Sequence, residues 1–94
     1  MNLNTEKLRN LLGSEDAAQK FVTLFRQQLP LQLEALRQAL ADRDWEQAGN
    51  VAHGLKSQCR YVGLEEAADL LQELENDPSG TMNDKLEAIY ALLG

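Results

Sequence analysis

The clearest fold signal lies in residues 45–62, which read WEQAGNVAHGLKSQCRYV. Apolar or small residues recur there at spacings of three and four, at positions Trp45, Ala48, Ala52, Leu55, Cys59 and Val62. This spacing places them on one face of an α-helix, as in a helix that packs into the core of a bundle. The segment is therefore predicted to be a core-facing helix.

His53, the only histidine of the chain, is directed away from that apolar face, by about 130° on a helix of about 100° per residue. Its neighbours one turn away on the helix are small or polar, namely Gly49, Asn50, Lys56 and Ser57, and Gly54 follows it directly. A glycine inside a helix costs about 1 kcal/mol relative to alanine, and the loss is useful where a partner must approach closely. We expect an exposed imidazole with clearance around it. Chance substitution on a solvated face remains the alternative.

Composition narrows the class of protein. Ninety-four residues, of which 44% are hydrophobic, suit one small domain with its own core. The formal net charge of −6 disfavours binding to nucleic acid or to anionic membranes, which select positive patches. No apolar run is long enough to span a membrane, and no signal peptide opens the chain. The lone Cys59 is expected to be buried, and a cytoplasmic location is expected.

The rest of the chain predicts four further helices. They are expected at about 4–12, 15–41, 64–76 and 82–93, with the His53 helix at 44–61. Candidate caps and breakers lie between them at Gly13, Ser14, Asp42-Arg43-Asp44, Gly63 and Thr81. Pro30 should bend the long helix. Because short connections make consecutive helices antiparallel neighbours, the predicted fold class is all-α. It is an antiparallel up-down four-helix bundle with a short N-terminal helix covering one end, one domain over residues 1–94.

Few chemistries fit these residues. A metal site is not expected, since His53 and Cys59 point to different sides of their helix and the carboxylates are scattered. The chain has no phosphate-binding glycine loop and no nucleophile elbow, so no cofactor and no autonomous kinase or hydrolase activity are expected. An exposed neutral imidazole can, however, accept and donate a phosphoryl group. Lys56 and Arg60, further along the helix, could offset the phosphoryl charge.

The segment resembles the histidine phosphotransfer (HPt) domain family of multistep two-component signalling. His53 and Lys56 match the family's His-x-x-Lys motif, and Gly63 matches the glycine that ends its helix. The resemblance implies that His53 takes a phosphoryl group on Nε2 from a receiver-domain aspartate and passes it to another receiver. It implies that Lys56 stabilises that group. The implied partners are receiver domains of a hybrid sensor kinase and a downstream regulator, with Mg²⁺ bound on the receiver, and the protein is expected to be a monomer.

Ser57 departs from the family pattern, which usually has glycine directly after the lysine. We expect Ser57 to tune partner choice and expect contacts with the partner from Gly49, Asn50, Gly54, Ser57 and Arg60. A helical adaptor, or a degenerate relative that binds receivers without accepting phosphate, remains the alternative, and a self-associating bundle is a third. Lys56→Ala is expected to leave stability nearly unchanged, because an exposed charge contributes little.

Overall fold

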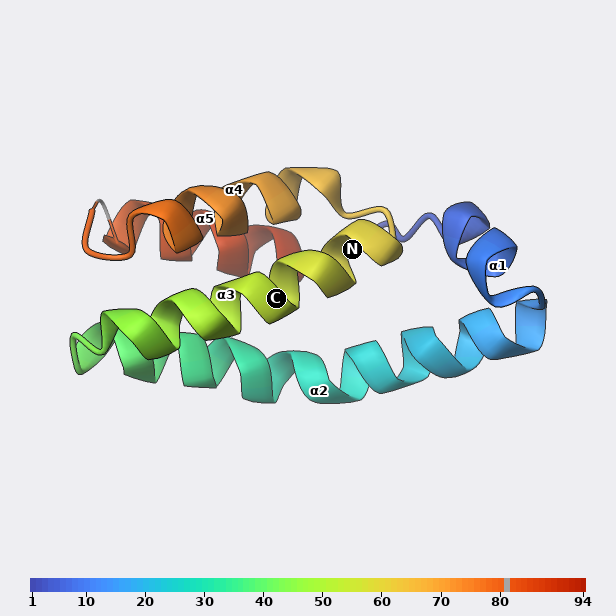
Figure 1. The fold of residues 1–94 in the computed structure, drawn as a ribbon, viewed down its shortest axis with the longest axis horizontal. Helices are drawn as coiled ribbons and strands as arrows, with labels where there is room; N and C mark the ends of the chain where they lie inside the picture. The colour runs from blue at the N-terminus through green and yellow to red at the C-terminus, as the bar shows by residue number, and fades with distance from the viewer. Residues whose placement is uncertain (81) are drawn as a thin grey trace.

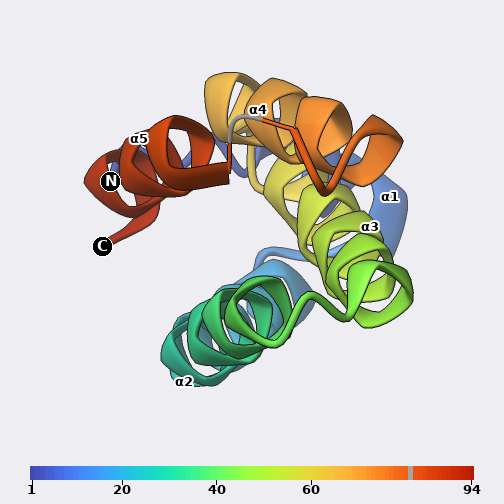
Figure 2. The ribbon, with the colours of Figure 1, turned by 90° about the vertical axis from the view of Figure 1, so that its left-hand side faces the viewer.

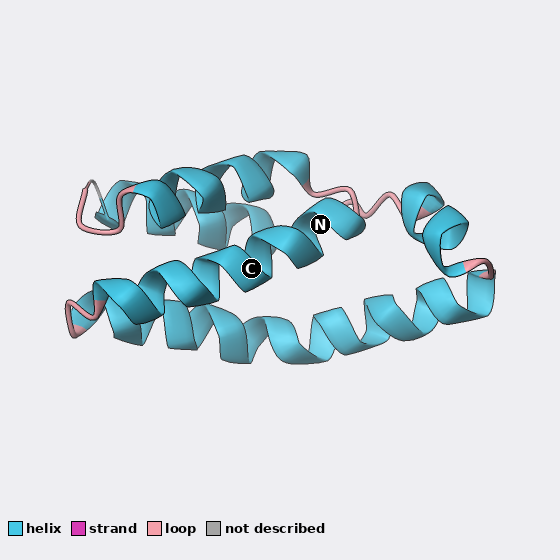
Figure 3. Cartoon of the chain, in the orientation of Figure 1, coloured by secondary structure: helices cyan, strands magenta, loops and turns pink. Residues whose placement is uncertain are grey.

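The computed structural model describes residues 1–80 and 82–94, without the side chains of residues 82 and 83. The described part contains helices α1 (Glu6–Leu12), α2 (Glu15–Ala41), α3 (Trp45–Tyr61), α4 (Glu65–Asn76) and α5 (Met82–Leu93). These bounds differ from the predicted ranges by at most two residues. The all-α prediction is confirmed, and Figure 3 shows how little loop joins the helices.

The longer helices begin at the polar residues that the sequence indicated. Ser14 Oγ accepts a hydrogen bond from the Ala17 N–H at 3.1 Å, and Asp44 Oδ1 accepts one from the Gln47 N–H at 3.2 Å. Each bond satisfies a backbone donor that the first turn of a helix leaves without a partner. The cap expected at Thr81 lies outside the described residues.

Glycines end α1 and α3 as predicted. Gly13 and Gly63 both have φ of +80°, the left-handed conformation that glycine adopts without steric cost. At Gly63 a side chain would also collide with the N-terminal segment, because a Cβ there would lie 2.7 Å from the Cβ of Asn4. The Asn4 N–H donates to the Val62 carbonyl at 2.9 Å. The turn after α3 therefore holds the N-terminal segment in place.

Pro30 lies inside α2, and the helix continues on both sides of it. Proline removes one backbone donor and crowds the preceding turn, which bends a helix. Figure 1 shows α2 as one long, bowed helix, so the expectation of a bent helix is confirmed.

Helices α2 to α5 form the bundle, and α1 lies at one end of it (Figure 1). The view along the long axis in Figure 2 shows α3 between α2 and α4, with α5 beside α4. The hydroxyl of Tyr90 on α5 donates to the Leu33 carbonyl on α2 at 3.2 Å and so links the first and last bundle helices. The predicted four-helix bundle with a covering N-terminal helix is the observed architecture.

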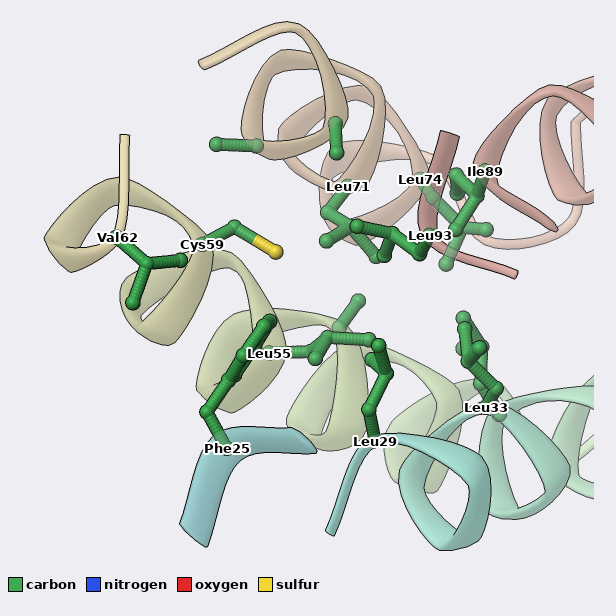
Figure 4. Packing of buried hydrophobic residues seen from close by; sticks show 14 of the residues in the cluster. Phe25, Leu29, Leu33, Leu55, Cys59, Val62, Leu71, Leu74, Ile89 and Leu93 are labelled. Carbon is green, nitrogen blue, oxygen red and sulfur yellow. The ribbon is translucent and has the colours of Figure 1, made fainter. Parts of the chain in front are cut away.

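The core consists mainly of aliphatic side chains, joined by the ring of Phe25, and every bundle helix contributes to it. Figure 4 shows them pointing toward one another, among them Leu29, Leu33, Leu55, Leu71, Leu74, Ile89 and Leu93. Of the residues predicted to face inward from this segment, Ala48, Ala52, Leu55, Cys59 and Val62 are fully buried. Trp45, at the start of α3, is only partly buried and packs against the core. Burial raises the pKa of the Cys59 thiol to about 12, so this cysteine acts as a small hydrophobic side chain. The packing fixes which face of α3 meets solvent.

Candidate functional site

His53 lies at the middle of α3, on the side of the helix that faces away from the core. Its side chain is 64% exposed, whereas Ala52 and Leu55 beside it are fully buried. The prediction of a solvent-facing imidazole is therefore confirmed. An incoming group can reach the ring without any movement of the core.

Glu75 on α4 holds one nitrogen of this imidazole. Its Oε2 lies 3.0 Å from His53 Nδ1. The pKa of the Glu75 carboxyl is lowered, chiefly because the Lys56 ammonium donates a hydrogen bond to it. Partial burial opposes this shift, and the hydrogen bond with His53 adds to it. An ionised carboxylate can only accept a hydrogen bond, so Nδ1 carries the proton and donates. In the neutral ring, the free lone pair is then on Nε2.

Lys56 is held by the same carboxylate and is not the exposed charge that the sequence suggested. Its Nζ donates to Glu75 Oε1 at 2.7 Å and to Gln72 Oε1 at 2.9 Å. Only 13% of its side chain is exposed. Lys56 lies on the flank of α3 next to α4, and α4 covers that flank. The two oxygens of Glu75 thus connect the ammonium to the imidazole.

Neither Glu75 nor Gln72 was singled out from the sequence. They are three residues apart and therefore share one face of α4. That spacing is the one sequence signal that could have pointed to Glu75 and Gln72 as site residues, and it is common on solvated helices. The register between α3 and α4 decides which α4 residues meet His53, and a single sequence does not supply this register.

The two glycines beside His53 are not needed for internal packing. A Cβ added at Gly49 or at Gly54 would meet nothing within 4 Å. Alanine would fit at either position and would stabilise the helix. Clearance for another molecule is therefore a physical reason for both glycines, and their contacts with a partner stay a prediction.

Three other predicted partner-binding residues lie on the same exposed side of α3. Asn50 is exposed. The Ser57 hydroxyl donates to the His53 carbonyl at 3.1 Å, a bond within the helix that keeps it close to the backbone. Arg60 donates to Glu65 at 2.8 Å and lies 3.4 Å from Asp69, so acidic side chains engage it. The structure brings these residues to one surface but does not test their roles.

Two features of the described residues concern metal binding and membrane insertion. Among them, no group of three or more histidine, cysteine or acidic side chains could hold a metal ion. None of the described helices has the length and apolarity that crossing a membrane requires.

Comparison with known proteins identifies the family of the chain. The family model described as "Hpt domain" matches residues 20–93. The chain is also 39% identical over 87 residues to "Sensor histidine kinase AruS" of Pseudomonas aeruginosa, an alignment that covers 93% of this chain and 7% of that kinase. No solved structure gives a significant match. The chain belongs to the Hpt family, the histidine phosphotransfer domains of two-component phosphorelays.

Proposed function

We propose that His53 is the phosphorylated residue and that it relays a phosphoryl group between aspartates of two receiver domains. The observation that carries this proposal is the contact between Glu75 and Nδ1, 3.0 Å apart, which leaves Nε2 of an exposed ring as the free nucleophile. His53 is also the one histidine available to a family defined by histidine phosphorylation.

The transfer balances without any proton leaving the site. The Nε2 lone pair attacks phosphorus, the bond from phosphorus to the donor aspartate oxygen breaks, and that aspartate leaves as a carboxylate. The ring keeps its Nδ1 proton and becomes cationic, and the Glu75 carboxylate beside Nδ1 stabilises that charge. In the onward step an acceptor carboxylate attacks phosphorus, and neutral imidazole leaves with its Nδ1 proton still in place.

Lys56 and Glu75 have complementary parts in this proposal. Lys56 supplies positive charge beside His53, where it would offset the negative charge of the phosphoryl oxygens, as the family resemblance implies. Glu75 positions both the ring and the ammonium through separate oxygens, 3.0 Å from Nδ1 and 2.7 Å from Nζ. Mg²⁺ and the in-line geometry would come from the receiver domain.

The donor is proposed to be a receiver domain of a sensor kinase, and the acceptor a downstream response regulator, in the cytoplasm. The similarity to a piece of a sensor histidine kinase supports the kinase as donor. The chain spans about 7% of that relative's length, so the activity of the rest of the kinase is not carried over.

A panel of phosphorylated, radiolabelled receiver domains tests the proposal, with His53→Gln as the matched variant. Label should reach the wild-type protein from at least one receiver, resist alkali and be lost in acid, as phosphohistidine requires. His53→Gln should stay unlabelled while its fold, followed by circular dichroism, is unchanged. Equal labelling of both proteins would refute the assignment of His53.

Ser57, where the family usually has glycine, favours one other function, receiver binding without transfer. In that case receivers would bind the wild type and His53→Gln equally, and neither would acquire label. The same panel, with binding followed by calorimetry, separates the two functions.

A further inference from the structure

The imidazole of His53 is held as a nucleophile by residues of this chain alone. Its Nδ1 lies 3.0 Å from Glu75 Oε2, and its side chain is 64% exposed. The Glu75 carboxylate is itself fixed, because Lys56 Nζ donates to its other oxygen at 2.7 Å and to Gln72 Oε1 at 2.9 Å. The lone pair on Nε2 therefore meets solvent, where a small molecule can reach it as readily as a protein can.

The nearest hydroxyl on the helix does not take over this role. A carboxylate that holds the Nδ1 proton of a histidine also occurs in hydrolases, where the histidine activates a serine hydroxyl. Here the Ser57 hydroxyl donates to the His53 carbonyl at 3.1 Å, so it is turned toward the backbone. The atom of this site that can form a bond to an electrophile is then Nε2 itself.

The charges around His53 decide which small electrophiles approach it. Glu75 lies beside the ring, and Glu65 and Asp69 engage Arg60 further along the same side of α3. The whole chain carries a formal net charge of −6. Small phosphate esters are anionic, so such a surface repels them unless a cation accompanies them. The carbonyl carbon of an uncharged ester meets no such repulsion.

We propose that His53, positioned by Glu75, has a second activity, the hydrolysis of small uncharged esters that have a good leaving group. Nε2 attacks the carbonyl carbon, the bond from that carbon to the ester oxygen breaks, and the leaving group departs as its anion. The ring keeps its Nδ1 proton, so the acylated ring is cationic and the Glu75 carboxylate stabilises it. Water then adds to the carbonyl carbon and gives a proton to solvent. The bond from carbon to Nε2 breaks, which releases the carboxylic acid and restores neutral imidazole.

This activity goes beyond the relay and does not depend on it. It needs the exposed Nε2 and the contact with Glu75, and it uses neither Mg²⁺ nor a receiver domain. Acylation and phosphorylation draw on the same lone pair, so each excludes the other at His53. Ester hydrolysis can therefore be measured on the protein alone, separately from any phosphoryl transfer.

The test uses para-nitrophenyl acetate, whose leaving group absorbs visible light. The wild type should release nitrophenolate over many turnovers, with a second-order rate constant about tenfold or more above that of His53→Gln. The rate constant should also exceed that of free methylimidazole. Glu75→Gln should lose most of this excess. Glu73→Gln, which removes the same charge from an exposed position of α4, should match the wild type.

A second ester tests the selection by charge. The acetate ester of hydroxynitrobenzoate carries a carboxylate on its leaving group. Relative to free methylimidazole, the protein should react less well with this anionic ester than with para-nitrophenyl acetate. An equal ratio for the two esters would contradict the part given to the surrounding carboxylates.

Each failure has its own signature. Equal release by the wild type and His53→Gln would overturn the proposal and leave the relay on His53 standing. A wild type no faster than free methylimidazole, or a Glu75→Gln variant with the wild-type rate, would also overturn it, because any exposed imidazole would then do as well. If the wild type hydrolysed the ester while no receiver labelled it, the relay would fall and the ester activity would stand.

Discussion

Glu75 holds His53 from a neighbouring helix, with its Oε2 3.0 Å from Nδ1 of the imidazole. The contact crosses between α3 and α4, and the second oxygen of the same carboxylate binds Lys56 at 2.7 Å. A rotation of the imidazole would break a charge-assisted bond, so the ring is kept with Nε2 outward. The site is therefore a three-residue arrangement, and the His-x-x-Lys motif contains two of its members.

Replacing Glu75 with glutamine should slow the transfer. The variant keeps the size of the side chain but loses the charge that fixes the tautomer and that, in the proposed transfer, stabilises the cationic phosphorylated ring. The loss of one charge-assisted hydrogen bond predicts a rate at saturating receiver about tenfold lower, with a smaller effect on KM. Rapid-quench transfer kinetics measure both constants.

Glu73→Gln is the matched control for this change. Glu73 is an exposed residue of the same helix, so the substitution removes the same charge from the protein without touching His53. If both variants slowed transfer equally, net charge would be the cause, and the positioning role of Glu75 would be wrong.

The same carboxylate predicts how stability depends on pH. The pKa of Glu75 is lowered on folding from an ordinary value of 4.5, chiefly by its hydrogen bond with Lys56. Below 4.5 the unfolded chain therefore binds more protons at this residue than the native protein. The contribution of Glu75 to the free energy of unfolding is fully present above pH 4.5 and is lost as the pH falls through the lower pKa of the native protein. Urea unfolding at a series of acidic pH values should show a shallower acid loss in Glu75→Gln. An identical slope in the two proteins would contradict this linkage.

Lys56→Ala should lower the stability of the protein, in contrast to the expectation from the helical wheel, and should also slow transfer. Its side chain is 13% exposed and binds both Glu75 and Gln72, so its removal leaves two acceptors on α4 without this donor. We expect a loss of about 1 kcal/mol, because the pair is still partly solvated. Chemical denaturation measures it, with Lys20→Ala, whose side chain is 81% exposed, as the control. A loss no larger than that of the control would contradict the packing described for Lys56.

Gly54→Ala should make the protein more stable and less active. Alanine is the better helix former by about 1 kcal/mol, and its Cβ meets nothing in the isolated protein. A gain in unfolding free energy together with a higher KM for the receiver would show that the glycine serves the partner. A gain in stability without any change in transfer would mean that clearance at this position is not used.

Most of the fold follows from local signals in the sequence. Ser14 and Asp44 cap helices as their positions suggest, and Gly63 ends α3 because glycine adopts its φ of +80° without steric cost. The apolar spacing in α3 placed His53 outward correctly. These features depend on residues close to one another in the chain, so one sequence is enough to predict them.

The site was predicted less completely, because its contacts join separate helices. The burial of Lys56 and the role of Glu75 depend on the register of α4 against α3, which is set by how Leu71 and Leu74 pack in the core. Alternative registers would bring other polar residues of α4 to the same place. The spacing within α3 alone does not distinguish among them.

The most direct test of the central claim identifies the ring nitrogen that carries phosphorus. The protein, labelled with ¹⁵N at histidine, is phosphorylated by a cognate receiver domain and followed by ³¹P and ¹⁵N NMR. The account predicts a single phosphohistidine, at His53, with phosphorus coupled to Nε2 and a proton retained on Nδ1. Phosphorus on Nδ1, or phosphorylation that persists in His53→Gln, would contradict it.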